Sequence, residues 1–179
     1  MIEAVVPTVR GREHLLKPCL TSLIDHGLTP VVVEDSPSCG EGWARGLERC
    51  TGPTVALWSD DFTVAAWDET GVIERLPQLV SPVILNPDLT VQGAGGMGLR
   101  LPDGAVAENC ICPIGPRHLF HEFQPWPPLN HYCDTWITQR ARWAFSGPVV
   151  TWGCQLVHYQ LASWDPDEYK AWQQWLGRP

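Results

Sequence analysis

Short apolar runs alternate with helical periodicity over the first third of the chain. Residues 2–7, 31–33 and 54–58 are apolar runs of the length of a strand. Between them, apolar side chains recur at helical spacing over residues 15–24 and 43–50. Because the run at 31–33 is continuous rather than alternating, it is typical of a strand buried on both faces, as in a parallel sheet under helices. The pattern therefore predicts a β-α-β-α-β unit.

The remainder of the chain has a less regular pattern. Residues 93–98 are rich in glycine but lack the spacing of a dinucleotide-binding turn. A terminal helix is expected from Asp165 as N-cap and Pro166 at its first position. The other predicted elements are a short helix at 76–79, a strand at 83–85, a hairpin over 99–107 turning at Asp103-Gly104, a helix at 134–144, and strands at 148–152 and 155–158.

Carboxylates follow two of the predicted strands. Asp35 comes after the second strand, and Asp60 and Asp61 come after the third. Right-handed crossovers would bring these strand ends to one edge of the sheet, where ligands bind in such folds, so the three acids are expected to meet. Neighbouring carboxylates repel each other, and Mg²⁺ or Mn²⁺ carrying a phosphate would compensate for them. A solvated turn is the alternative interpretation of the pair.

Composition narrows the classes of function. The net charge is −8, and basic residues form no stripe, which argues against strong non-specific binding to nucleic acid. The seven cysteines include no Cys-x-x-Cys, so reduced thiols are expected rather than a zinc site. We find no apolar segment long enough to span a membrane and no signal peptide, and we therefore expect a cytoplasmic protein.

Taken in order, five segments resemble the GT-A glycosyltransferases, most closely those of family 2. Each is weak alone, and their order and spacing carry the resemblance. Cys133 stands where the family often has Glu, and Ser59 where it often has a first acid of the metal motif. The segments are residues 5–8 with Arg10, residues 31–36 ending in an acid, the helix from residue 42 with Arg45, the acidic motif at 57–62, and the helix that opens at Asp134.

The resemblance implies a fold and a set of site residues. The expected fold is α/β, a GT-A domain over 1–179 with a mostly parallel central sheet flanked by helices. Residues 1–62 would form the nucleotide-binding half, 63–160 the acceptor half and 161–179 a C-terminal helix. Asp134 would be the catalytic base, Asp61 and His158 would bind Mn²⁺ or Mg²⁺, and Trp126, in a Pro-rich loop, would stack on the acceptor. The donor nucleotide would contact Pro7, Thr8, Arg10, Asp35, Arg45 and Asp60.

The resemblance implies a metal-dependent glycosyltransferase that moves a sugar from a nucleotide-sugar, expected to be a UDP-sugar, to an acceptor hydroxyl. The transfer would invert the anomeric configuration. The alternative to a catalytic role for Asp134 is a structural one, as the N-cap of its helix. A nucleotidyltransferase is a second hypothesis, although residues 7–12 hold only one Gly and two Arg of its Gly-rich, basic signature. A catalytically inactive nucleotide-sugar-binding domain is a third. A hydroxymethylated DNA base is a minor option for the acceptor, against which the acidic charge counts.

Overall fold

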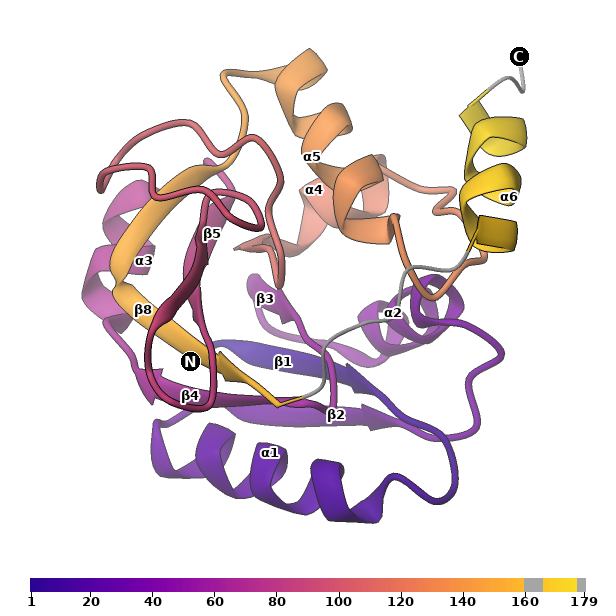
Figure 1. Ribbon diagram of the computed structural model, residues 1–179, viewed down its shortest axis with the longest axis horizontal. Helices are drawn as coiled ribbons and strands as arrows, with labels where there is room; N and C mark the ends of the chain where they lie inside the picture. The colour runs from indigo at the N-terminus through magenta and orange to yellow at the C-terminus, as the bar shows by residue number, and fades with distance from the viewer. Residues whose placement is uncertain (160–165, 177–179) are drawn as a thin grey trace.

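Strand and helix alternate over the first five elements, as the hydrophobic pattern predicts. The computed structural model describes residues 1–159 and 166–176 (Figure 1). Helix α1 begins at Glu13, before the apolar residues that predicted it. It ends two residues before Gly27, which has a positive φ of 79°. These elements are β1 (Glu3–Pro7), α1 (Glu13–Asp25), β2 (Thr29–Val33), α2 (Cys39–Arg49) and β3 (Thr54–Leu57).

The later elements are more numerous than the sequence predicts. They are β4 (Phe62–Ala66), α3 (Glu69–Arg75), β5 (Val80–Leu85), β6 (Val91–Ala94), β7 (Ile114–Pro116), α4 (Arg117–Glu122), α5 (Cys133–Ala144), β8 (Val149–His158) and α6 (Pro166–Leu176).

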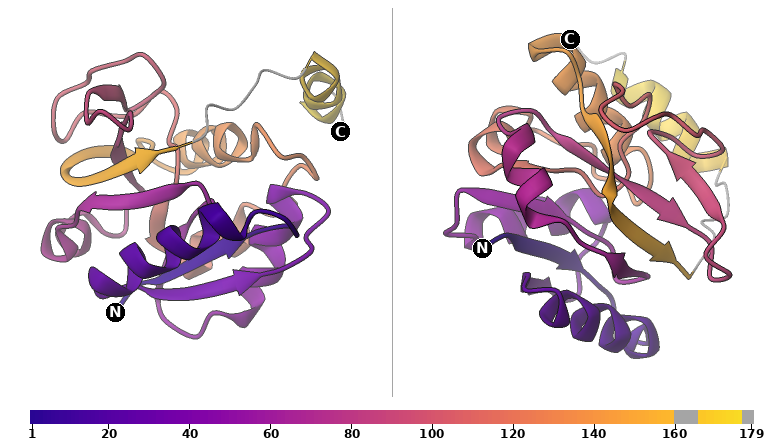
Figure 2. Two further views of the ribbon diagram at one scale, coloured as in Figure 1. Left: turned by 60° about the horizontal axis from the view of Figure 1, so that its bottom comes forward. Right: turned by 90° about the vertical axis from the view of Figure 1, so that its left-hand side faces the viewer.

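One mixed sheet of eight strands organises the described residues. Its order is β2-β1-β3-β7-β5-β8-β4, and β6 pairs with β5. Parallel pairing joins β2, β1 and β3 and again β5 and β8, and it holds most of the paired residues. The other pairs are antiparallel. Helix α1 packs against both β2 and β4, from opposite ends of this order, so the sheet curls around that helix (Figure 2). The α/β class with a flanked, mostly parallel sheet is confirmed.

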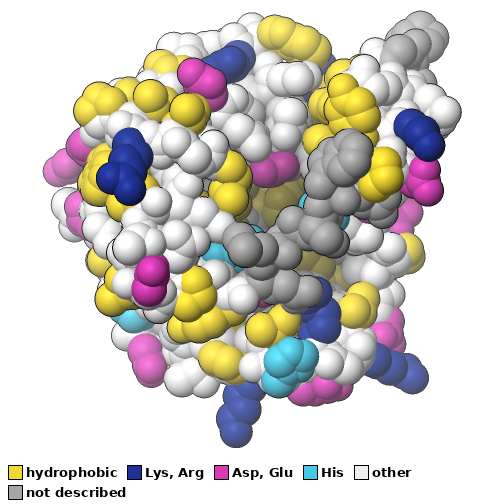
Figure 3. Space-filling model, viewed as in Figure 1, with side chains coloured by type: hydrophobic (Ala, Val, Ile, Leu, Met, Phe, Trp, Pro, Cys, Tyr) yellow, Lys and Arg dark blue, Asp and Glu magenta, His cyan; other side chains and the backbone are white. Residues whose placement is uncertain are grey.

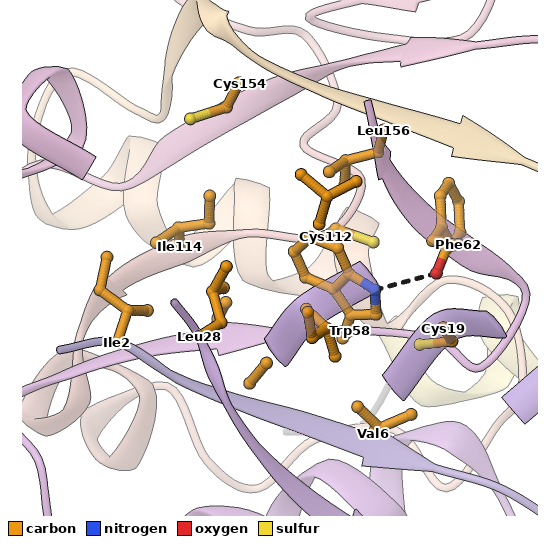
Figure 4. Packing of buried hydrophobic residues seen from close by; sticks show 14 of the residues in the cluster. Ile2, Val6, Cys19, Leu28, Trp58, Phe62, Cys112, Ile114, Cys154 and Leu156 are labelled. Carbon is orange, nitrogen blue, oxygen red and sulfur yellow. Dashed lines mark hydrogen bonds between the residues drawn. The ribbon is translucent and has the colours of Figure 1, made fainter. Parts of the chain in front are cut away.

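The two faces of β1 belong to different parts of the core. Ala4 and Val6 pack in one cluster with Cys19 and Leu23 of α1, whereas Val5 packs in a second cluster with residues of α2. This burial on both sides explains why residues 4–7 of the strand are apolar without interruption. Figure 4 shows the first cluster, in which the buried Trp58 ring lies among Cys19, Cys112 and Leu156 and its Nε1 donates to Phe62 O at 3.4 Å.

Glycine permits the close approach of α2 to β1. A Cβ atom on Gly46 would lie 2.1 Å from Cγ1 of Val5, so any side chain there would force the helix or the strand to shift. Nearer the start of α2, a Cβ on Gly42 would lie 2.4 Å from Cβ of Pro7, so the carboxyl end of β1 lies directly beside the first half of this helix.

Several predicted elements were wrong. The helix expected at 76–79 is α3, which ends at Arg75, because Pro77 disfavours a helical conformation for the residue before it. The two late strands are one, β8. The hairpin over 99–107 contains the expected turn, with Ala105 N donating to Pro102 O at 3.2 Å, but no named strand. Individual amides of this segment instead donate hydrogen bonds to neighbouring segments, such as Gly104 N to Val150 O at 2.9 Å.

Two further expectations concern the chain's end and its cysteines. Pro166 is the first residue of α6, as predicted, whereas the expected N-cap at position 165 lies outside the described residues.

All seven cysteines are free thiols. Burial raises the pKa of Cys19 to about 12 and that of Cys50 to about 11, so both thiols stay protonated at neutral pH. Within the described part of the chain, no helix is long and apolar enough to cross a membrane.

Candidate functional site

A cavity of about 650 Å³ opens at the carboxyl ends of β1 and β3. Its walls come from the loop after β1, the start of α2, the turn between β3 and β4, the loop after β6, the start of α5 and the end of β8. Figure 3 shows a hollow on this face of the molecule with carboxylate and histidine side chains at its floor. The position agrees with the rule that open α/β sheets bind ligands beyond the carboxyl ends of their strands.

Asp60 is held at the base of the cavity by two partners. Its side chain is only 4% exposed. Thr8 Oγ1 donates to Asp60 Oδ2 at 2.7 Å, and Arg12 lies 2.9 Å from the same oxygen through Nε and 2.7 Å from Oδ1 through Nη2. Because both carboxylate oxygens are engaged by donors of the protein, Asp60 is charge-compensated and fixed.

Asp61 has different surroundings. Ser59 Oγ donates to its Oδ1 at 2.7 Å, and its Oδ2 lies 3.6 Å from His158 Nε2 and 3.4 Å from Arg12 Nη2. Burial opposes ionisation of Asp61, but hydrogen bonds from His158 and Ser59 outweigh it and hold the pKa below its ordinary value. Asp61 is thus an ionised carboxylate with no short bond from a cation of the protein.

His158 completes this corner of the cavity. Its ring stacks on Phe62, with centroids 4.4 Å apart, and its Nδ1 lies 3.2 Å from Gln92 Oε1. When Nδ1–H donates to the Gln92 oxygen, Nε2 faces Asp61 either as a protonated donor or as a bare lone pair that requires a cation between the two groups. His158 is 9% exposed, so its orientation is fixed by packing.

Asp61 and His158 fit a divalent cation as two of its ligands. Two ligand atoms on one ion of this size are separated by about 3.0 to 3.4 Å, close to the 3.6 Å observed here. Within residues 1–159 and 166–176, no group of three or more His, Cys, Asp and Glu side chains has metal-binding geometry. Asp60 is not available as a third metal ligand, because Arg12 and Thr8 already bind its carboxylate oxygens. The remaining ligands would have to come from a substrate or from water.

Asp134 lies in the first turn of α5 and lines the same cavity. It is not the N-cap, a position that Tyr132 holds with a left-handed φ of 68°. Burial raises the pKa of the Asp134 carboxyl, against the opposing effects of the Thr135 amide at 2.8 Å and Asn109 Nδ2 at 3.3 Å. A carboxylate with a raised pKa is better suited to accepting a proton than an exposed one.

Six of the predicted site residues line this cavity and four do not. Arg10 and Asp35 form an exposed ion pair at 3.2 Å beside a smaller neighbouring cavity of about 180 Å³, so the expected meeting of Asp35 with the acidic pair was wrong. Arg45 is exposed on α2, away from the cavity. The six that line it are Pro7, Thr8, Asp60, Asp61, Asp134 and His158.

Trp126 was predicted as a stacking platform, and its position is wrong for that role. It is 6% exposed and packs edge-on against Trp43, with centroids 6.3 Å apart. The Pro-rich loop folds onto the start of α2, where a Cβ on Gly40 would meet Pro127 O at 2.2 Å. Trp126 is therefore a core residue, although its Nε1 has no hydrogen-bond partner among the residues that the structure describes.

Sequence reasoning missed Arg12, Asn109 and Gln92 as parts of the site. Arg12 had a usable signal, because it lies in the polar loop between the first strand and the first helix, at the sheet edge where ligands bind. Asn109 and Gln92 had none, since the long connection after β6 brings Asn109 to Asp134, and β6 pairing brings Gln92 to His158.

Comparison with known proteins shows the fold. No family model matches the chain, and no curated protein matches it. S. aureus TarS, a glycosyltransferase, matches with a TM-score of 0.70 and 14% identity over 97% of this chain, which spans 38% of that protein. TarS 1–349 in complex with UDP-GlcNAc gives 0.63 and 14%, covering 97% of this chain and 64% of that one. A197 from STIV gives 0.58 and 11%, covering 88% and 81%.

These matches support a GT-A-like fold for the chain, and they do not support the family 2 assignment. The expected domain halves remain a prediction.

Proposed function

We propose that the cavity binds a nucleotide-sugar, UDP-linked, and that the chain transfers the sugar to a hydroxyl acceptor. One observation carries the proposal: a single cavity holds an ionised carboxylate beside an imidazole, Asp61 and His158, and a carboxylate of raised pKa, Asp134. Its volume of about 650 Å³ is in the range of small-molecule sites. The fold shared with TarS, whose complex with UDP-GlcNAc is known, supports this choice of ligand.

The acidic corner would receive the diphosphate. Asp61 Oδ2 and His158 Nε2 would hold Mn²⁺ or Mg²⁺, and the bound ion would supply stabilisation of the negative charge that builds on the leaving group. Thr8 and Arg12 engage both oxygens of Asp60 at short distance, so that Asp61, whose contacts with Arg12 and His158 are longer, is the carboxylate that would face the phosphates. Without these contacts, two adjacent acids would repel an anionic donor.

Asp134, which lines the same cavity, would act as the base. It would accept the proton of the acceptor hydroxyl as that oxygen attacks the anomeric carbon. Asn109 and the Thr135 amide orient the carboxylate for this step. A single base acting on the face opposite the leaving group would invert the anomeric configuration, by the geometry that separates inverting from retaining glycoside hydrolases.

Binding of UDP in the presence of Mn²⁺ tests the donor site. A ligand that binds only the native state raises the melting temperature, so the native protein should melt higher with UDP and Mn²⁺ than with either alone. Asp61→Ala should lose this shift, and Asp35→Ala, outside the cavity, should keep it. A shift of equal size in native protein and Asp61→Ala would contradict the proposed site.

Product analysis separates transfer from its rivals. A glycosyltransferase releases a nucleoside diphosphate, whereas a nucleotidyltransferase releases pyrophosphate. Asp134→Asn should keep UDP binding and lose transfer by about 100-fold or more, as expected for removal of a general base. If Asp134→Asn and the native protein have the same turnover, Asp134 is not the base; if neither has any, the chain is a binding domain.

A further inference from the structure

Helix α6 packs on the loop that forms one wall of the cavity. Residues 130–132 of this loop line the cavity and lead directly into α5 (Figure 1). The ring of Trp172 stacks on Tyr132 with centroids 5.6 Å apart and an interplanar angle of 10°, and it meets Trp136 edge-on at 6.4 Å. Trp172 is 4% exposed, so α6 is docked through a buried aromatic contact.

Glu168 of α6 binds this loop through both of its carboxylate oxygens. Asn130 N donates to Oε1 at 3.0 Å and His131 N donates to Oε2 at 3.1 Å, while the His131 ring contacts Oε2 through Nδ1. The Glu168 side chain is 16% exposed. A carboxylate that accepts two successive backbone amides fixes the direction of the peptide planes between them.

The next residue, Tyr132, is held in an unfavourable conformation. Its φ of 68° is in the left-handed region, which a non-glycine residue adopts when its surroundings determine it. Its carbonyl accepts from Trp136 N at 2.9 Å, the first turn of α5, so the peptide plane of Tyr132 sets the direction in which that helix begins. The Glu168 contacts hold the chain just before Tyr132, and Trp172 packs on its ring.

We infer that Glu168 is a positioning residue: it clamps residues 130–132 and thereby fixes the first turn of α5, so that the Asp134 carboxylate points into the cavity. Nothing in the local sequence indicates this role, because Glu168 is 34 positions after Asp134 and on another helix. The inference rests on the proposed function of Asp134 as the base. It extends the site to a helix that contributes no cavity-lining atom of its own.

The test compares Glu168→Gln with Asp167→Asn. Both replace a carboxylate by its amide in the first turn of α6, but the side chain of Asp167 is 86% exposed and pairs with Lys170 of the same helix. Glutamine cannot accept both backbone amides, because one end of its amide is itself a donor. Hydrogen–deuterium exchange of the peptide covering residues 128–136 should therefore become about tenfold faster in Glu168→Gln and stay at the native rate in Asp167→Asn.

Kinetics supply the second readout. Misplacement of a catalytic group by about 1 Å costs up to 100-fold in rate, so kcat should fall roughly 10- to 100-fold in Glu168→Gln with the donor KM little changed. Trp172→Ala should change both readouts in the same direction, and it replaces Glu168→Gln if that variant does not fold. Native exchange over 128–136 in both variants overturns the clamp.

The two proposals fail in different ways. A drop in kcat no larger than that of Asp167→Asn overturns the positioning of Asp134. A native protein that binds UDP with Mn²⁺ but transfers no sugar, or binds no UDP, contradicts the proposed function, and the exchange measurement then decides the clamp by itself.

Discussion

The guanidinium of Arg12 is bound side-on to Asp60, with Nη2 2.7 Å from Oδ1 and Nε 2.9 Å from Oδ2. This pair makes the two adjacent acids unequal. Asp60 is paired and buried, whereas Asp61 is ionised and oriented toward His158. The sequence leaves open which of the two acids would bind a metal, and the arginine that follows the first strand favours Asp61 because it occupies Asp60. We propose Asp61 as the ligand.

Removal of Arg12 should therefore be costly. In Arg12→Met, Asp60 would be left as a buried charge with only Thr8 as a partner, and such losses cost about 3–5 kcal/mol. The measurement is the free energy of unfolding in urea at neutral pH. Arg10→Met is the matched control, because the Arg10–Asp35 pair is exposed and should contribute less than about 1 kcal/mol. Equal losses in the two variants would contradict the distinct role of Arg12.

Gln92 should affect metal binding without touching the metal. It orients the His158 ring through Nδ1, and loss of such an outer partner typically weakens metal binding about 10- to 100-fold. Mn²⁺ binding in the presence of UDP, followed by electron paramagnetic resonance, should show this weakening in Gln92→Ala and a larger one in His158→Ala. His118→Ala, at an exposed position on α4, should bind Mn²⁺ as the native protein does. Native affinity in His158→Ala would exclude it as a ligand.

The acid limb of the pH–rate profile should reflect the raised pKa of Asp134. The base must be ionised, and burial raises its pKa, so kcat/KM should fall on acidification at a pH above the ordinary aspartate value of 3.8. A profile flat down to that value would contradict the assignment. An acid limb governed by the donor's own titration would move with the nucleotide used, so a second nucleotide-sugar serves as the control.

The same shift predicts that Asp134 costs stability. Its folded pKa lies above its unfolded value, so its contribution is most favourable below the unfolded pKa and is lost as pH rises through the folded pKa. Asp134→Asn should therefore be more stable than the native protein at pH 7, by an amount that shrinks on acidification. The pKa of Asp61 is lowered in the folded protein, so its effect on stability has the opposite pH dependence. Its stabilising contribution is present above the unfolded pKa and is lost as pH falls through the folded pKa. Urea denaturation of the native protein, Asp134→Asn and Asp61→Ala across pH checks the two slopes.

The contact of Gly46 with β1 should resist any side chain. In Gly46→Ala, the new Cβ would lie 2.1 Å from the Val5 side chain, and overpacking of this kind costs typically about 1–3 kcal/mol. Ala44→Gly, on the same helix, should lose about 0.5–1 kcal/mol through helix propensity. Thermal melting compares the two. A Gly46→Ala variant as stable as the native protein would show that α2 can move away from the sheet.

The sequence predicts the parts of the fold that local pattern determines. Unbroken apolar runs identified β1, β2 and β3, and the acids after β3 marked the site. Three-residue β7 and the short α4 were missed because they carry too few residues for a period to show. Trp126 was misplaced because prolines around it suggested an exposed loop, whereas tertiary packing against Trp43 buries it. Arg10 was preferred to Arg12, and only the start of α1 at Glu13 decides which of the two reaches the acids.

The clamp on residues 130–132 also has a consequence for synthesis. The site joins Thr8, which holds Asp60, to a wall that Glu168 supports from 160 positions further along the chain, so Glu168 leaves the ribosome much later than Thr8. The β-α-β-α-β unit could take shape while translation continues, but the wall beside Asp134 lacks its support until α6 has emerged. Nascent chains stalled before residue 168 should therefore be folded in their first half, with a turnover at least as low as that of Glu168→Gln, and full activity would then report translation through α6.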